Sequence, residues 1–151
     1  MTEEISLSEQ HAPQDRAVEA FSILSPQIKE VLLKSRKDWD KHEPRMYESV
    51  SSVSDADLAS FDVKKGDLVA VRAGTVSYGT IIFGKIRLPK AGPDAYIHVR
   101  IHDPPDGEQS AKDVVFHSLY TEEGGKTPDD DRPKWYRAIM SEKDPIAFFH
   151  E

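Results

Sequence analysis

Cysteine and asparagine are both absent from the 151-residue sequence. Without cysteine the chain has no disulfide, no thiolate metal ligand and no cysteine nucleophile, and without asparagine it has no N-glycosylation acceptor. No apolar run approaches the roughly 20 residues that cross a membrane. Residues 1–5 are acidic and lack the hydrophobic region of a secretory signal. These absences predict a soluble, cytoplasmic protein that does not contact a membrane.

The length of the chain is that of one domain, large enough to bury roughly two-thirds of its unfolded surface. Hydrophobic residues make up 38% and charged residues 31%, which is typical of a polar globular protein. We expect a flexible tail over residues 1–12 and a single α+β domain over residues 13–151. Within that domain the patterns indicate a helical part at 13–61, a β part at 62–122, and a C-terminal loop and helix at 123–151.

The net charge of −7 is distributed in three blocks of alternating sign. Residues 1–61 hold 7 Lys/Arg against 12 Asp/Glu, residues 62–102 hold 7 against 3, and residues 103–151 hold 6 against 12. Either the acidic flanks pack beside the cationic strands, or the strands present a basic surface to an anionic partner. The overall acidity argues against nucleic-acid binding, which needs a net basic footprint.

Four runs of strand-like sequence lie at residues 68–71, 80–83, 95–102 and 114–120. The third run alternates strictly between apolar and polar residues, which is the period of a strand with one buried and one solvated face. We therefore predict that its apolar residues are buried and that its polar residues face water. The apolar set is Ala95, Ile97, Val99 and Ile101, and the polar set is Tyr96, His98, Arg100 and His102.

Short strands joined by glycine-bearing links predict a small antiparallel, barrel-like or curved sheet. Gly84 directly follows the second run and, within that strand, indicates a bulge or a sharp bend. The segment from Gly66 to Arg72, which begins with a Gly-Asp pair, resembles the first strand of SH3-like and Tudor-like barrels. The expected fold is thus α+β, with N-terminal helices packed on a barrel-like sheet and a short C-terminal helix.

Two amphipathic helices are predicted before the strands, separated at Ser25-Pro26. Proline lacks an amide hydrogen and clashes with the preceding turn, so it ends the first helix, while serine followed by proline starts a second helix well. Asp144-Pro145 predicts the start of the C-terminal helix in the same way, with Ile146, Phe148 and Phe149 docking it. The second helix has an inward stripe of Ile28, Val31, Leu32, Ser35 and Trp39. Its basic residues are expected to face water or the C-terminal end of the helix, and they are Lys29, Lys34, Arg36 and Lys37.

The histidines of the third and fourth runs do not have the spacing of a metal site. His98 and His102 are four residues apart on one strand, roughly 13 Å at ~3.3 Å per residue, whereas two imidazoles that bind one zinc ion each place a nitrogen about 2 Å from it. Only one of them can join His117 of the neighbouring strand. We therefore predict no metal site and folding that is independent of metal. The sequence also holds no phosphate-binding glycine loop and no dinucleotide fingerprint, so no cofactor is expected.

A pocket between the helices and a curved sheet would give these histidines a chemical role. Folds of the nuclear-transport-factor-2 type share that architecture and place acid–base residues in the pocket. A histidine paired with a carboxylate could act there as a general base, so the alternative function is a small enzyme or a small-molecule-binding protein. The histidine candidates are His98, His102 and His117, and the carboxylate candidates are Asp94, Asp103 and Asp113.

The leading expectation is a non-catalytic binding or protein-interaction module that uses the exposed face of the sheet. Aromatic area and guanidinium groups are the usual anchors of protein interfaces, and an acidic peptide or the acidic flank of another protomer would suit the cationic segment 62–102. We therefore predict a protein partner or self-association, with a small-molecule ligand as the alternative. The predicted binding residues are Arg72, Tyr78, Tyr96, His98, Arg100 and His102.

Overall fold

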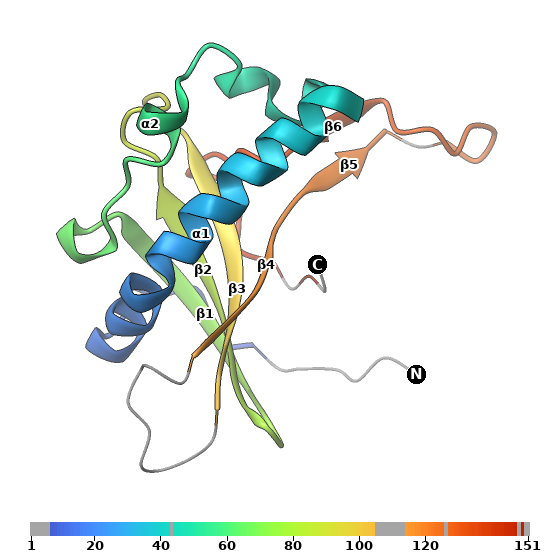
Figure 1. Ribbon diagram of the computed structural model, residues 1–151. Coiled ribbons are helices and arrows are strands. Elements are labelled where there is room, and N and C mark those ends of the chain that lie inside the picture. The colour runs from blue at the N-terminus through green and yellow to red at the C-terminus, as the bar shows by residue number, and fades with distance from the viewer. Residues whose placement is uncertain (1–6, 43, 105–113, 126, 148, 150–151) are drawn as a thin grey trace.

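One long helix lies across an antiparallel sheet in the computed structural model (Figure 1). The structure describes residues 7–42, 44–104, 114–125, 127–147 and 149. Its helices are α1 (Asp15–His42), α2 (Asp55–Leu58) and two short 3-10 helices, Pro44–Val50 and Val63–Lys65. Its strands are β1 (Leu68–Val76), β2 (Gly79–Arg87), β3 (Tyr96–Asp103), β4 (Val115–Leu119), β5 (Glu122–Gly124) and β6 (Trp135–Arg137). The fold class is α+β, as predicted.

The main sheet has the strand order β1-β2-β3-β4, and each neighbouring pair is antiparallel. The four predicted strand runs correspond to these four strands, of which β1 and β2 extend well beyond the predicted limits. β1 and β4 form the two edges, so over the described residues the sheet is open and the predicted barrel is not closed. β5 and β6 pair as a separate two-stranded sheet.

The predicted break at Ser25-Pro26 is wrong, because α1 continues through both residues. A proline inside a helix removes one main-chain hydrogen bond and costs about 3 kcal/mol. The apolar stripe stays in phase on both sides of the proline and packs into the core, so its burial offsets that cost. The buried apolar residues of the stripe are Ala17, Ala20, Phe21, Leu24, Ile28 and Leu32. Charged residues interrupt the rest of α1, and no helix in the described part of the chain could span a bilayer.

The face of the sheet toward α1 holds the main core. Ile97, Val99 and Ile101 are fully buried in it, which confirms the prediction from the alternation. The strand pairing is regular at Gly84, so the bulge predicted there is not present. A Cβ atom at Gly84 would instead lie 2.5 Å from the ring of Phe21 in α1. Glycine is needed at this position because the helix approaches β2 closely.

The second face of the sheet is covered by residues that follow β6. Main-chain hydrogen bonds join Tyr96 to Met140 in both directions and bring the chain back to the edge of β3. Ile146 and Phe149 then pack with other apolar side chains on this face. Tyr96, His98 and Arg100 are therefore buried, and the prediction that the polar residues of this strand face water is wrong for these three. His102, near the end of β3, stays partly exposed.

Residues 144–147 and 149 are not helical, so the predicted C-terminal helix is not formed in the described residues. The Asp144 carboxylate accepts a hydrogen bond from the Ser141 amide at 2.7 Å, and the Asp144 amide donates to the Ser141 oxygen, so residues 141–144 form a turn. The carbonyl groups that a helix would use are bound by side chains of the sheet, as with Arg72 and the Ile146 oxygen at 2.6 Å. Phe148, which was expected to dock this helix, lies outside the described residues.

The predicted N-terminal tail lies partly along the free edge of β1. Main-chain hydrogen bonds join His11 to Val71 in both directions, and the Ser8 amide donates to the Ala73 oxygen at 2.8 Å. This pairing satisfies main-chain groups that an edge strand otherwise leaves open. Residues 1–6 of the predicted tail lie outside the described residues.

Candidate functional site

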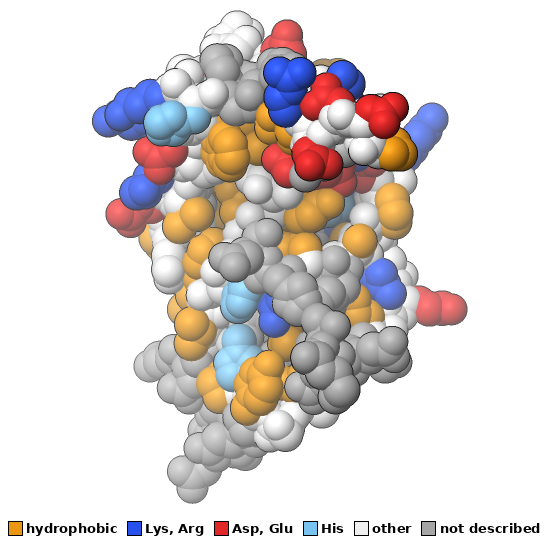
Figure 2. All heavy atoms as spheres, turned by 90° about the vertical axis from the view of Figure 1, so that its right-hand side faces the viewer, with side chains coloured by type: hydrophobic (Ala, Val, Ile, Leu, Met, Phe, Trp, Pro, Cys, Tyr) orange, Lys and Arg blue, Asp and Glu red, His pale blue; other side chains and the backbone are white. Residues whose placement is uncertain are grey.

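A cleft of about 310 Å³ lies at one end of the second face of the sheet. Its volume is at the lower end of the usual range for ligand pockets. Three strands contribute to it because His102 of β3 lies opposite Ile81 of β2 on one side and Val115 of β4 on the other. Figure 2 shows histidine side chains among hydrophobic ones on this side of the molecule. The residues that line the cleft are Tyr78, Ile81, Arg100, His102, Val115, Phe116 and His117.

Tyr78 and His102 are held together at the turn between β1 and β2. The Nε2 atom of His102 lies 2.7 Å from the main-chain oxygen of Tyr78, and the two rings are 5.4 Å apart between centroids. A carbonyl oxygen only accepts, so Nε2 carries the hydrogen and Nδ1 is the acceptor nitrogen of the neutral ring. Gly79 permits this geometry: its φ is +133°, and a Cβ atom there would lie 2.8 Å from His102 Nε2.

The rim of the cleft includes two exposed apolar side chains, whereas Ile81 at its floor is buried. Tyr78 is 52% exposed and Val115 is 54% exposed, although both are large hydrophobic residues. Ile81 of β2, which also lines the cleft, is fully buried. Exposed aromatic and aliphatic side chains around a small cavity are the usual features of a binding surface.

The structure divides the six predicted binding residues into two groups. Tyr78, Arg100 and His102 line the cleft. The other three, Arg72, Tyr96 and His98, do not line it. Tyr96 and His98 are buried, and Arg72 donates from Nη1 to the Ile146 oxygen and from Nε to the Ser8 oxygen.

His98 is fully enclosed on the second face, with 2% of its surface exposed. Burial, reinforced by the positive charge of Lys85, lowers the pKa of His98 to about 4. Its ring stacks on Tyr120 at 6.2 Å between centroids, and its Nε2 atom has no hydrogen-bond partner in the described part of the chain. His98 is therefore neutral at pH 7 and a poor general base.

The carboxylates predicted to orient a catalytic histidine are engaged elsewhere. Asp103 pairs with Arg16 of α1 at 2.9 Å, and Asp94 accepts a hydrogen bond from the Glu142 amide at 2.7 Å. Asp113 lies outside the described residues. His117 of β4 lies 2.6 Å from the Ser118 hydroxyl through its Nδ1 atom. The cleft thus brings together two of the predicted histidines, His102 and His117, but neither Asp94 nor Asp103 lines it.

Sequence reasoning missed the apolar residues of the cleft and the role of Lys85. Val115 follows from the strand register, because it faces the same side as His102 across β3 and β4, but a shift in that register at Arg100 and Ile101 is not visible in the sequence. Lys85 is buried and donates to the main-chain oxygens of Glu142 and Asp144 at 2.7 and 2.6 Å. The position of a lysine inside an otherwise apolar strand could have indicated that Lys85 is buried and binds carbonyl groups.

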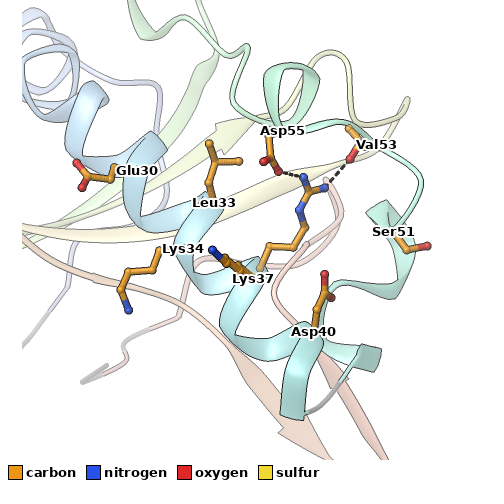
Figure 3. Close-up of a pocket in the computed structure, with 9 residues that line it drawn as sticks. Glu30, Leu33, Lys34, Lys37, Asp40, Ser51, Val53 and Asp55 are labelled. Atoms are coloured by element: carbon orange, nitrogen blue, oxygen red, sulfur yellow. Dashed lines mark hydrogen bonds and ion pairs between the residues drawn. The ribbon is translucent and has the colours of Figure 1, made fainter.

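A second cavity, of about 610 Å³, lies between α1 and the residues that precede α2 (Figure 3). Arg36 was predicted to face water or the C-terminal end of its helix. It is buried beside this cavity, where it donates to the Val53 oxygen at 2.6 Å and pairs with Asp55. Lys34 and Glu30 point away from that pair in Figure 3, and Lys34 pairs with Asp38 at 2.8 Å. This cavity is a hollow on the surface, lined mostly by charged side chains, and Arg36 is one of them.

Metal-ligating side chains do not gather in the described residues, where no group of three or more His, Asp or Glu could hold an ion. No family model matches the chain, and neither a characterised protein nor a solved structure matches it. The cleft itself is therefore the basis for assigning a function.

Proposed function

We propose that the protein is a non-catalytic interaction module that binds a segment of another protein in the cleft. The observation that carries this proposal is the pair of half-exposed apolar residues, Tyr78 and Val115, on the rim above the buried Ile81. Water contact with such side chains is unfavourable, and a partner that covers both would gain about 25 cal/mol for each Å² of apolar surface buried. Tyrosine is also among the residues that dominate interface energies.

The chemistry of the partner follows from the rim and the walls. An aliphatic or aromatic side chain would enter the cleft between Tyr78 and Val115. An acidic group beside that side chain would be attracted by Arg100, which lines the cleft. Added salt would weaken this attraction by screening, so the affinity should fall as ionic strength rises.

A second candidate function is binding or turnover of a small molecule, with His102 as a general base. The observation that favours it is the fixed ring of His102, whose Nε2 hydrogen is bound by the Tyr78 oxygen and whose Nδ1 is the acceptor nitrogen. A histidine that is held in one tautomer and lines a cavity is suited to accept a proton. His102→Gln would then abolish turnover, whereas the same substitution would weaken the binding of a protein partner without abolishing it.

The proposed function is tested with matched substitutions of exposed aliphatic residues. A peptide library displayed on phage is selected against the full-length protein, and the selected peptide is titrated by isothermal calorimetry. Val115→Asp places a charge in the cleft and should weaken binding at least tenfold. Ile23→Asp makes the same kind of change on α1, where Ile23 is 41% exposed, and should leave affinity within twofold. Equal effects of the two substitutions would exclude the cleft as the binding site.

A further inference from the structure

Three cations of the second sheet face bind main-chain oxygens of one segment, residues 141–147 and 149, here called the C-terminal segment. Arg72 donates to the Ile146 oxygen at 2.6 Å. Lys85 donates to the Glu142 and Asp144 oxygens. Arg100 donates to the Phe149 oxygen at 2.7 Å. The sheet thus recognises groups that every peptide possesses, whatever its sequence.

Two side chains of the C-terminal segment supply the apolar contacts. Ile146 and Phe149 are buried with Ala70, Ile81 and Phe83, and this small cluster is separate from the main core under α1. The rings of Phe149 and Phe83 meet edge to face at 5.1 Å between centroids. The two clusters share no residue, so the apolar contacts of the C-terminal segment lie outside the main core.

We infer that the second sheet face under the C-terminal segment is a peptide-binding groove, here called the segment groove, which the chain fills with its own residues. Its partner is an extended segment of another protein that carries a branched aliphatic residue and, three residues later, a phenylalanine. The partner's main-chain oxygens take the places of those of Ile146 and Phe149 on Arg72 and Arg100. The C-terminal segment is then a built-in competitor of that partner.

The way the C-terminal segment is held favours exchange. Residues 144–147 and 149 belong to no strand or helix, and the amide of Ile146 donates to a side chain, Gln10 Oε1, at 3.1 Å. The side chains of Arg72 and Gln10 therefore bind both main-chain groups of Ile146. A second peptide of similar shape can use the same donors and acceptors.

The segment groove is continuous with the cleft. Ile81 and Arg100 belong to both: they line the cleft, and they contact the C-terminal segment through the apolar cluster and the Phe149 oxygen. This inference rests on the proposed function, because it extends the same binding site along the sheet. It adds the motif that the partner carries and the competitor that limits its binding.

The test uses the full chain with Phe149→Ala, which removes one anchor of the C-terminal segment. A fluorescent peptide with the sequence of residues 141–149 is titrated, and its anisotropy gives the dissociation constant. Wild type should bind at least tenfold more weakly than the variant, because its groove is free for only a fraction of the time. A control peptide with aspartate in place of both anchors should bind neither protein. A variant that remains folded and binds no more tightly than wild type would overturn the inference.

Hydrogen exchange on the wild type provides a measurement that needs no variant. The amides of residues 142, 144 and 146 should exchange at least 100-fold faster than those of Val99 and Ile101, because the C-terminal segment opens without global unfolding. Equal exchange rates would show that the C-terminal segment is a fixed part of the core and would overturn the inference. A dimer that forms in place of the peptide complex would assign the groove to a second copy and would also overturn it.

Val115→Asp separates this inference from the proposed function. Val115 lines the cleft but is not part of the apolar cluster around Ile146 and Phe149. When it is combined with Phe149→Ala, binding of the 141–149 peptide should change less than threefold. If the 141–149 peptide binds the Phe149→Ala variant as expected but Val115→Asp does not weaken the selected partner, the proposed function alone is refuted. If Val115→Asp weakens the selected partner but Phe149→Ala does not bind the 141–149 peptide more tightly than wild type, this inference alone is refuted.

Discussion

Arg100 of β3 donates a hydrogen bond from Nη1 to the main-chain oxygen of Phe149 at 2.7 Å, across 49 positions of the sequence. Its side chain also lines the cleft, and its guanidinium lies over the ring of Phe83 at 5.6 Å from the centroid. This one residue therefore joins the fold of the second sheet face to the candidate binding site. Burial lowers the pKa of Arg100 without removing its charge at neutral pH.

Arg100→Met tests the structural part of that role. The substitution keeps a long apolar side chain but leaves the Phe149 oxygen without its charged donor. The free energy of unfolding should fall by about 1.5–3 kcal/mol, the contribution of a hydrogen bond to a charged group, as measured by urea denaturation. Arg87→Met is the control, because Arg87 is exposed at the end of β2 and should change stability by less than about 0.5 kcal/mol.

Ile101→Ala tests the assignment of the core face of β3. Ile101 is fully buried beneath α1, so its truncation leaves a cavity and should lower the free energy of unfolding by about 2–5 kcal/mol. Ile23→Ala, at an exposed position on α1, provides the comparison. If urea melts of the two variants differ by less than about half a kcal/mol, the assignment of the buried face is wrong.

His98 predicts a loss of stability in acid. Its pKa is about 4 in the folded protein against 6.5 for the ordinary side chain, so between these values the unfolded chain binds more protons than the folded one. The contribution of the neutral His98 ring to the free energy of unfolding is fully present above pH 6.5 and is lost as the pH drops toward 4. The total loss is about 3 kcal/mol, at 1.36 kcal/mol per pKa unit.

The measurement is a set of urea melts at pH 7.5 and at pH 4.5 on wild type and on His98→Phe. Acidic residues such as Asp144, whose pKa is lowered despite its burial by the Ser141 amide and Arg137, add their own loss in acid. This loss from the acidic residues is the same in the wild type and in His98→Phe. A wild type that loses no more stability than the variant on acidification would contradict the burial of a neutral His98.

Much of the sheet could be predicted from the sequence, because alternation in a strand reports directly which residues a core accepts. Ile97, Val99 and Ile101 follow from it. The fate of the opposite face does not, because a polar residue such as Arg100 suits either water or a carbonyl group from a distant segment. Main-chain oxygens of residues 142–149 are not visible as a sequence pattern, so the covering of this face could not be foreseen.

The predictions of the helix boundaries were wrong for a related reason. Pro26 disfavours a helix locally, but the burial of the stripe on both of its sides outweighs that cost. Asp144-Pro145 favours a helix start locally, but the sheet binds the carbonyl groups that follow. Three residues of the candidate site could be predicted from the sequence: Tyr78, Arg100 and His102. That they lie beside Val115 could not be predicted, because it depends on the register of β4 against β3.

Chelation tests the prediction that the fold needs no metal. Excess EDTA should leave the melting temperature unchanged, because no set of ligands with metal-site geometry occurs in the described residues. The comparison is the same melt with added zinc after dialysis. A fall of ten degrees on chelation, reversed by zinc, would contradict the geometric argument from His98 and His102.

The proposed function is tested most directly by nuclear magnetic resonance of the full-length, nitrogen-15-labelled protein during titration with the selected peptide. The amide signals of Tyr78, His102, Val115 and His117 should shift together and saturate with one dissociation constant, because these residues surround the cleft. Signals of the exposed face of α1, including Ile23, should not move. Shifts that are confined to α1 or to the cavity beside Arg36, with the cleft signals unchanged, would contradict the assignment of the cleft as the binding site.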